Sequence, residues 1–191
     1  MNDEPTRIPE LVRRAQFAAH EAEFAMSCKD RTGALLATLA ASKPGGLLLE
    51  LGTGTGVGTA WLLSGMTTDA HLITVEADPA TAMLARGTLG ADPRVSLVVA
   101  DAESWLDTYT GPGVDLVFVD CRPDRFRRRA DLLGHLNPGG LYIGDDLLPE
   151  PTWPDDHEPR VEKFLAEIID EPNLVVTLMT WSSGLVVAAR T

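Results

Sequence analysis

The chain has 191 residues, of which 45% are hydrophobic and 23% are charged, and its formal net charge is −12. This acidic balance argues against nucleic acid or an anionic membrane surface as the main partner. No run of about 18 apolar residues predicts a transmembrane helix, and the polar N-terminus has no signal-peptide core. The two cysteines, Cys28 and Cys121, are too few for a disulfide framework. A cytoplasmic protein is therefore expected.

Two helices are predicted at the start of the chain. Apolar residues recur at helical spacing in residues 9–27 and again in residues 31–41, which predicts two amphipathic helices. Residues 28–33 join the two helices and are a candidate flap over a ligand.

A strand, a glycine-rich turn and a helix are predicted over residues 46–63, GLLLELGTGTGVGTAWLL. The apolar run at residues 47–49 follows a Pro-Gly-Gly sequence and predicts a strand buried on both faces, with Glu50 at its carboxyl end. Glycines alternate with other residues in the turn, and a helical pattern follows. This order of elements opens nucleotide-binding α/β folds, in which glycines let a ligand approach the backbone.

The glycine spacing distinguishes between candidate ligands. The dinucleotide fingerprint G-x-G-x-x-G fails, because Val57 or Thr59 stands at the third glycine position in the two possible frames. The P-loop pattern is also missing from the sequence. A dehydrogenase is therefore disfavoured, whereas an amino-acid tail with a sulfonium suits a loop of backbone groups beside a carboxylate. The alternative is a turn that only connects the strand to the helix.

Acidic residues follow the later predicted strands. We expect these strands over residues 72–75, 95–99, 115–119 and 141–143, and the acids after them are Glu76, Asp101, Asp120, Asp145 and Asp146. Open α/β sheets bind ligands at this carboxyl edge. Glu76 lies roughly 20 residues beyond the glycine turn, where such folds bind ribose hydroxyls. One carboxylate can accept both hydrogen bonds of a vicinal diol.

The remaining elements complete an α/β fold. Helices are predicted over residues 79–89, after Asp101, and over 123–136 and 160–169, with a turn at 137–140, a proline-rich loop at 147–159, and terminal strands at 174–179 and 185–189. We expect a Rossmann-like, seven-stranded and mostly parallel sheet, with one antiparallel strand near the C-terminus and helices on both faces. Residues 1–191 are expected to form a single domain, in which N-terminal helices (1–42) precede the core (43–191).

Three motifs resemble a known family. The glycine turn with LITVEADP, then VDLVFVDCRPDRF, then LNPGGLYIGDDLLP are similar to class I S-adenosylmethionine-dependent methyltransferases, in particular the bacterial and catechol O-methyltransferase group. The resemblance covers roughly residues 26–191. It implies methyl transfer from S-adenosylmethionine to a hydroxyl of a small, aromatic molecule. It also implies a homodimer, which this family often forms.

The resemblance implies roles for individual residues. Glu50 and the glycine turn contact the methionine part of S-adenosylmethionine, Glu76 binds the ribose, and the neighbourhood of Asp101 and Ala102 borders the adenine. The full set of implied cofactor-binding residues is Glu50, Gly52, Thr53, Gly54, Thr55, Gly56, Thr59, Glu76, Ala77, Asp101, Ala102 and Asp120.

A divalent cation is also implied by the resemblance. Asp120 and Asp145 stand at the positions of metal-ligating aspartates, and Asp146 stands where the group usually has asparagine as the third ligand. Three oxygen ligands of this kind suit Mg²⁺ or Ca²⁺. The cation would hold the substrate hydroxyls and aim one oxygen at the methyl group. The alternative is that Asp145 and Asp146 only cap the loop that follows.

One departure from the family pattern leaves the catalytic base open. Pro123 stands where the group has its catalytic lysine, and proline cannot accept a proton. Asp120, Asp146 and His157 are therefore the candidate catalytic residues. The alternative for His157 is a loop residue that is merely exposed to solvent.

Pro123 also keeps two other functions open. One is a metal-independent methyltransferase for another acceptor, such as an amine or a carboxylate, and the other is a non-catalytic domain that binds S-adenosylmethionine. Trp153 and Trp181 either form walls around an aromatic substrate or anchor their loops by packing.

Overall fold

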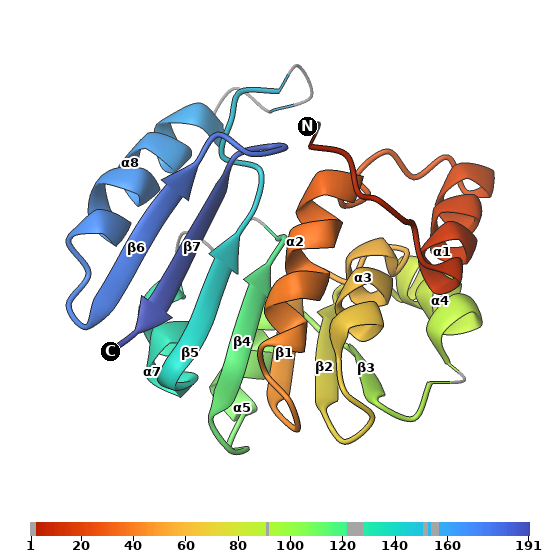
Figure 1. Ribbon diagram of the computed structural model, residues 1–191, viewed down its shortest axis with the longest axis horizontal. Coiled ribbons are helices and arrows are strands. Elements are labelled where there is room, and N and C mark those ends of the chain that lie inside the picture. The colour runs from red at the N-terminus through yellow and green to blue at the C-terminus, as the bar shows by residue number, and fades with distance from the viewer. Residues whose placement is uncertain (1–2, 91, 122–127, 151–152, 154–156) are drawn as a thin grey trace.

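Seven strands form one sheet in the computed structural model of the protein, which describes residues 3–90, 92–121, 128–150, 153 and 157–191 (Figure 1). The strands are β1 (Leu47–Leu51), β2 (His71–Glu76), β3 (Val95–Val99), β4 (Val114–Val119), β5 (Leu136–Gly144), β6 (Leu174–Met179) and β7 (Leu185–Arg190). Their order across the sheet is β3-β2-β1-β4-β5-β7-β6. Strands β1 to β5 pair in parallel, and β7 is antiparallel to both β5 and β6. The predicted sheet with one antiparallel strand is confirmed.

Helices cover both faces of this sheet (Figure 1). The described helices are α1 (Glu10–Glu21), α2 (Asp30–Ala41), α3 (Val57–Gly65), α4 (Pro79–Leu89), α5 (Ala102–Thr108), α7 (Arg129–His135) and α8 (His157–Ile169). Helices α1 to α4 pack on one face, and α5, α7 and α8 pack on the other. Leu48 belongs to the first core and Leu49 to the second, because successive side chains of a strand point to opposite faces.

Two helix ends differ from the prediction, and both lie near the carboxyl edge of the strands. The first helix ends at Glu21 instead of residue 27, because the backbone turns at Glu23, whose φ is +52°. The last helix begins at His157 instead of residue 160, and His157 is only 1% exposed. The interpretation of His157 as a solvent-exposed loop residue is therefore wrong.

Five strands are longer than predicted, namely β1, β2, β4, β5 and β7, and the extensions of β1 and β5 change the interpretation of nearby residues. β1 continues to Leu51, so Glu50 lies inside the strand. β5 begins at Leu136 and includes the predicted turn at 137–140, and its pairing with β4 shifts register between Val114 and Leu116. The predicted helix at 123–136 is described only from Arg129, since residues 122–127 lie outside the described residues. Within the described ranges, no helix combines the length and the hydrophobicity that crossing a bilayer requires.

Helices α2 and α3 pack closely together. A Cβ added at Gly33 would lie 2.1 Å from Cδ1 of Trp61, and a Cβ added at Gly65 would lie 1.9 Å from the carbonyl oxygen of Ala37. Neither position has room for a methyl group. This contact fixes α2, and with it the segment that enters α2 from α1.

Replacing Gly33 with alanine should destabilise the protein by about 1–3 kcal/mol, because the added methyl group displaces Trp61. For a chain of this length, the expected fall in Tm is roughly 2–10 °C. Gly87→Ala is the matched control, since Gly87 lies inside α4 and no described atom outside the adjacent backbone of that helix lies within 4 Å of its added Cβ. Alanine's higher helix propensity should raise Tm slightly there. Thermal unfolding measures both variants, and equal Tm values would contradict the close packing.

Candidate functional site

The turn between β1 and α3 requires glycine for two reasons. Gly52, Gly54 and Gly56 have φ values of +96°, +55° and +93°, a region that residues with a side chain rarely adopt. In addition, a Cβ at Gly52 would lie 2.7 Å from the carbonyl oxygen of Asp120, and one at Gly56 would lie 2.8 Å from Cδ1 of Leu89. The backbone therefore bends tightly around the end of β1.

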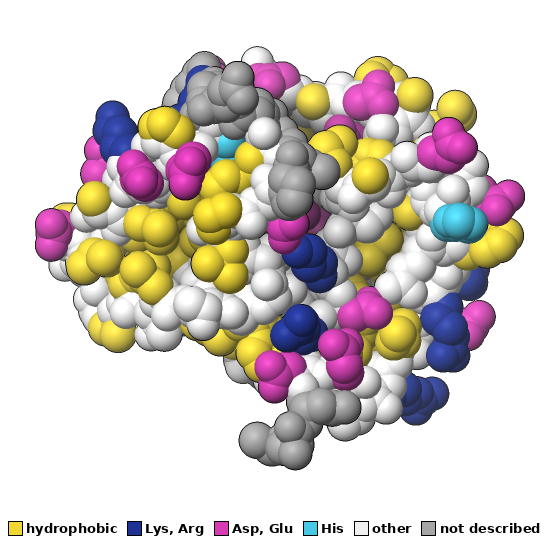
Figure 2. Space-filling model, turned by 90° about the horizontal axis from the view of Figure 1, so that it is seen from above, with side chains coloured by type: hydrophobic (Ala, Val, Ile, Leu, Met, Phe, Trp, Pro, Cys, Tyr) yellow, Lys and Arg dark blue, Asp and Glu magenta, His cyan; other side chains and the backbone are white. Residues whose placement is uncertain are grey.

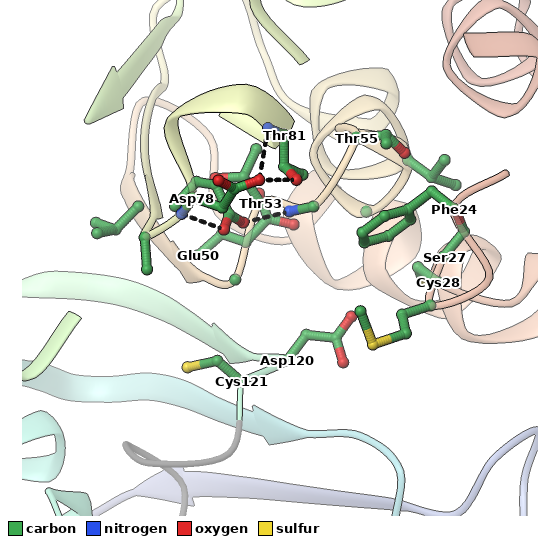
Figure 3. A pocket seen from close by; sticks show the side chains of 18 of the residues that line it. Phe24, Ser27, Cys28, Glu50, Thr53, Thr55, Asp78, Thr81, Asp120 and Cys121 are labelled. Carbon is green, nitrogen blue, oxygen red and sulfur yellow. Dashed lines mark hydrogen bonds between the residues drawn. The ribbon is translucent and has the colours of Figure 1, made fainter. Parts of the chain in front are cut away.

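A cavity of about 400 Å³ lies beside this turn at the carboxyl edge of the strands (Figure 3). Its size is typical of a site for a small molecule. The implied cofactor residues that line it are Glu50, Gly52, Thr53, Gly54, Thr55, Glu76, Ala77, Asp101, Ala102 and Asp120. Two other implied residues support the cavity without lining it: Gly56 caps α3, and Thr59 is buried in α3 and donates to Glu50.

The carboxyl group of Glu50 is fully buried at the cavity wall. Its Oε2 accepts hydrogen bonds from the hydroxyls of Thr59 and Thr74, the latter at 2.6 Å. Its Oε1 has no hydrogen-bond partner among the described residues. Burial raises the pKa of Glu50 from 4.5 to about 7, the threonine hydrogen bonds oppose this shift, and the charge of Glu76 adds to it. A cationic donor in the cavity would satisfy Oε1 and favour the ionised carboxylate.

Glu76 connects the end of β2 to the glycine turn. Its Oε2 accepts from the backbone N–H of Gly54 at 2.8 Å, and its Oε1 accepts from the backbone N–H of Asp78 at 3.0 Å (Figure 3). An ionised carboxylate has about four acceptor sites. Glu76 can therefore hold the turn in place and still accept hydrogen bonds from a diol in the cavity.

Asp101 caps helix α5 at the far end of the cavity. Its Oδ1 accepts from the backbone N–H of Ser104 at 2.9 Å and from the Ser104 hydroxyl at 3.0 Å, and these hydrogen bonds lower the pKa of Asp101. Ala102 follows in the first turn of the helix and also lines the cavity.

The segment between α1 and α2 forms one wall of the cavity. Phe24, Met26, Ser27 and Cys28 line the cavity, and Figure 3 shows the labelled members of this set opposite Asp78. Of these wall residues, only Cys28 belongs to the predicted flap at residues 28–33. The other three fall within the predicted first helix, because no glycine or proline in the sequence marks the end of α1.

Cys28 is buried in this wall among acidic groups. Burial raises the pKa of its thiol, and the nearby carboxylates of Asp145, Asp120, Glu50 and Asp30 raise it further. The thiol is therefore held in its neutral form.

The cavity is strongly acidic. Its described lining includes five carboxylates, those of Glu50, Glu76, Asp78, Asp101 and Asp120, and no Lys, Arg or His. Acidic side chains are also spread over the whole face of the molecule that lies at this end of the strands (Figure 2). A ligand with positive charge is therefore favoured over an anion.

The two acids after β5 are held by protein groups. Asp145 is 4% exposed, and its Oδ1 accepts from Ser183 Oγ at 2.6 Å and from the backbone N–H of Asp146 at 2.7 Å. Asp146 accepts from the indole N–H of Trp153 at 2.9 Å, and its other oxygen lies 3.6 Å from Nε2 of His157.

The predicted cation site is not supported by this geometry. In the part of the chain that the structure describes, no three His, Cys, Asp or Glu residues are arranged to hold a metal ion. Asp120 lines the cavity, whereas Asp145, Asp146 and His157 do not. Each of the three aspartates stands after the strand end that the sequence predicted, and the cation site itself stays a prediction.

Comparisons with known proteins agree with this fold. A sequence profile described as "Methyltransferase domain" matches residues 49–147. A protein of Mycobacterium bovis (strain BCG / Pasteur 1173P2) that is named as an O-methyltransferase is 40% identical over 168 residues, which cover 83% of this chain and 75% of the relative. Cofactor-bound Rv0187 from MTB is 25% identical with a TM-score of 0.84, and the match covers 96% of this chain and 90% of that one. The O-methyltransferase from Bacillus cereus, solved in complex with S-adenosylhomocysteine (SAH), shares the fold with a TM-score of 0.85 at 23% identity, over 97% of this chain and 93% of that one.

The sheet order, the glycine turn and the cavity beside it define a class I methyltransferase fold. Together with the profile match and the 40% identical relative, they show that the chain belongs to the family of S-adenosylmethionine-dependent O-methyltransferases.

Glu50→Gln should change how stability depends on pH in the ligand-free protein. The pKa of Glu50 is about 7 in the folded state and 4.5 in the unfolded state, so the folded state binds more protons between these values. The free energy of unfolding therefore falls as pH rises through this window, and the wild type should lose about 3 kcal/mol more than the variant. Urea unfolding at pH values below and above the window measures the difference, and parallel pH profiles would contradict the burial of an ionisable Glu50.

Proposed function

We propose that this protein transfers the methyl group of S-adenosylmethionine to a hydroxyl of a small, aromatic molecule. The observation that carries the proposal is the buried carboxylate of Glu50 in the lining of the cavity, which has one oxygen bonded by threonines and the other without a hydrogen-bond partner among the described residues. A zwitterionic ligand with an ammonium group matches that arrangement.

The described cavity residues fit this cofactor along its length. Glu50 Oε1 and Thr55 Oγ1 are buried polar atoms without a hydrogen-bond partner among the described residues, and both residues line the cavity. We assign them to the methionine end. Glu76, at the end of β2, takes the ribose hydroxyls, and Asp101 with Ala102 lies where the adenine would extend.

The charge of the cavity supports a sulfonium ligand. S-adenosylmethionine carries positive charge on its sulfur and on its ammonium group, while the cavity presents five carboxylates. Coulomb attraction between such groups is strongest where protein excludes water. Methyl transfer removes the sulfonium charge, so the product is held less strongly by this wall of acids.

The reaction is mainly a matter of positioning. When bound, S-adenosylmethionine supplies a methyl group on a positively charged sulfur. The acceptor oxygen forms the new O–C bond while the S–C bond breaks, and the electron pair of that bond stays on sulfur. The hydroxyl proton needs an acceptor, and we assign this role to Asp120, the predicted catalytic residue that lines the cavity.

Glu76→Gln should weaken SAH binding about 10-fold or more, because it removes the charge that strengthens hydrogen bonds to the ribose. Glu158→Gln is the control, since Glu158 is an exposed acid on α8 and its replacement changes the net charge equally. Isothermal titration calorimetry with SAH measures both variants. A wild-type protein that does not bind SAH would overturn the proposed function.

Asp120→Asn should lower the rate of methylation about 100-fold, which is the usual effect of losing a general base. A panel of phenols and catechols provides the acceptors, and release of SAH is the signal. The affinity of the variant for SAH should stay within about threefold of the wild type, because the amide occupies the same volume as the carboxylate. Turnover equal to that of the wild type would remove Asp120 from the reaction.

A further inference from the structure

We infer that Asp146 anchors the segment after β5 by binding Trp153 beside the buried His157, and that this enzyme transfers methyl groups without a divalent cation. The inference rests on the proposed function and concerns how its hydroxyl is activated. It departs from the family pattern, in which the corresponding positions hold a metal ion.

Asp146 is bonded to one protein side chain and lies close to a second. Its Oδ1 accepts from the indole N–H of Trp153 at 2.9 Å, and its Oδ2 lies 3.6 Å from Nε2 of His157. The rings of Trp153 and His157 lie against each other, with their centroids 4.4 Å apart, and His157 is 1% exposed. These three side chains form a compact cluster, which we call the Asp146 anchor.

The backbone around the Asp146 anchor is fixed at several further points. The N–H groups of Leu147 and Leu148 donate to the carbonyl oxygen of Ser183 at 3.0 and 2.8 Å. Glu150 forms an ion pair with Lys29, which precedes α2. Turning the carboxylate of Asp146 towards the cavity would break the bond to Trp153 within a segment that these contacts hold in place.

Asp145 is also bound by protein groups. Its Oδ1 accepts from Ser183 Oγ at 2.6 Å, and this hydroxyl lies 3.5 Å from Thr32 Oγ1 in α2. All three residues are at most 5% exposed. Asp145 therefore joins the end of β5 to the turn before β7 and to α2.

Asp120 is then the one member of the predicted metal set that lines the cavity. One carboxylate is too few for Ca²⁺, which takes about six to eight oxygen ligands. Mg²⁺ sites with so few carboxylates usually rely on substrate phosphates, and S-adenosylmethionine has none. The hydroxyl proton therefore passes to Asp120 directly, as the O–C bond forms and the S–C bond breaks.

This arrangement has a consequence for the acceptor. A bound cation favours two neighbouring hydroxyls, because both can coordinate it. Without a cation, a second hydroxyl adds no such contact. We therefore expect the methylation rates of phenols with one hydroxyl and of catechols to agree within about 10-fold.

Cation binding is tested on the full-length protein with SAH present. Calorimetric titration with MgCl₂, CaCl₂ or MnCl₂ should show no saturable binding, and the affinity for SAH should change less than twofold in EDTA. Saturable binding of one of these ions, or turnover that EDTA abolishes and Mg²⁺ restores, would overturn the inference while leaving the proposed function intact. Failure to bind SAH in both EDTA and Mg²⁺ would instead overturn the proposed function.

The Asp146 anchor is tested by a double-mutant cycle measured in EDTA. Trp153→Phe removes the indole N–H and keeps an aromatic ring, and Asp146→Gly removes the carboxylate at a position whose φ of +63° glycine tolerates. Each change should lower Tm by about 2–8 °C. The fall in Tm of the double variant should be clearly smaller than the sum of the falls in the two single variants, because Trp153 and Asp146 interact directly.

Trp181→Phe provides the matched control for this cycle. The indole N–H of Trp181 donates to the backbone carbonyl of Arg31 at 3.1 Å, so its loss should add to that of Asp146→Gly. If the falls in Tm caused by Trp153→Phe and Asp146→Gly were also additive, the Asp146 anchor would be overturned. In the calorimetric titration with cations, Asp146→Gly should give the same result as the wild type, that is, no saturable binding.

Discussion

The carboxylate of Glu50 connects the sheet, the glycine turn and the ligand cavity. Thr59 from α3 and Thr74 from β2 both donate to its Oε2, so one side chain ties a helix and a strand to β1. Its Oε1 would lie only 2.6 Å from a Cβ at Gly58. The first turn of α3 can therefore pack this close to Glu50 only because residue 58 is glycine. A buried carboxylate without a cationic partner is costly. The cost raises the pKa of Glu50 in the ligand-free protein, and a bound ammonium group would offset it.

The rest of the cavity extends this electrostatic preference. Glu76 and Asp101 follow neighbouring strands and face the same space, and each also performs a structural task in the backbone. Their carboxylates hold the glycine turn and cap α5 in the ligand-free protein. The site is thus largely preformed, which lowers the entropy lost on binding. The wall from the α1–α2 segment, with Phe24 packed 3.3 Å from where a Cβ at Gly54 would lie, closes the cavity over the turn.

The carboxyl ends of β4 and β5 carry the three aspartates that the family pattern assigns to a metal ion. The strands place Asp120, Asp145 and Asp146 at neighbouring carboxyl ends, as the family pattern requires. The loops then decide what each carboxylate binds. The hydroxyl of Ser183 donates a hydrogen bond to Asp145, and the indole N–H of Trp153 donates one to Asp146. Of the three aspartates, Asp120 is the one that lines the cavity. In this protein, the proposed chemistry depends on a carboxylate base and on close positioning.

The sequence by itself determined the succession of strands and helices along the chain and the edge of the sheet at which the cavity lies. Periodicity and glycine spacing are local properties, so helix α4 and strands β3 and β6 have the bounds that the pattern predicts. The acids that line the cavity were found because parallel strands end at one edge. The burial of His157 was decided only by the tertiary structure, as were the partners of Asp145 and Asp146. Each of these depends on contacts between segments far apart in the chain, and a local pattern carries no information about which distant hydroxyl or indole will reach a carboxylate.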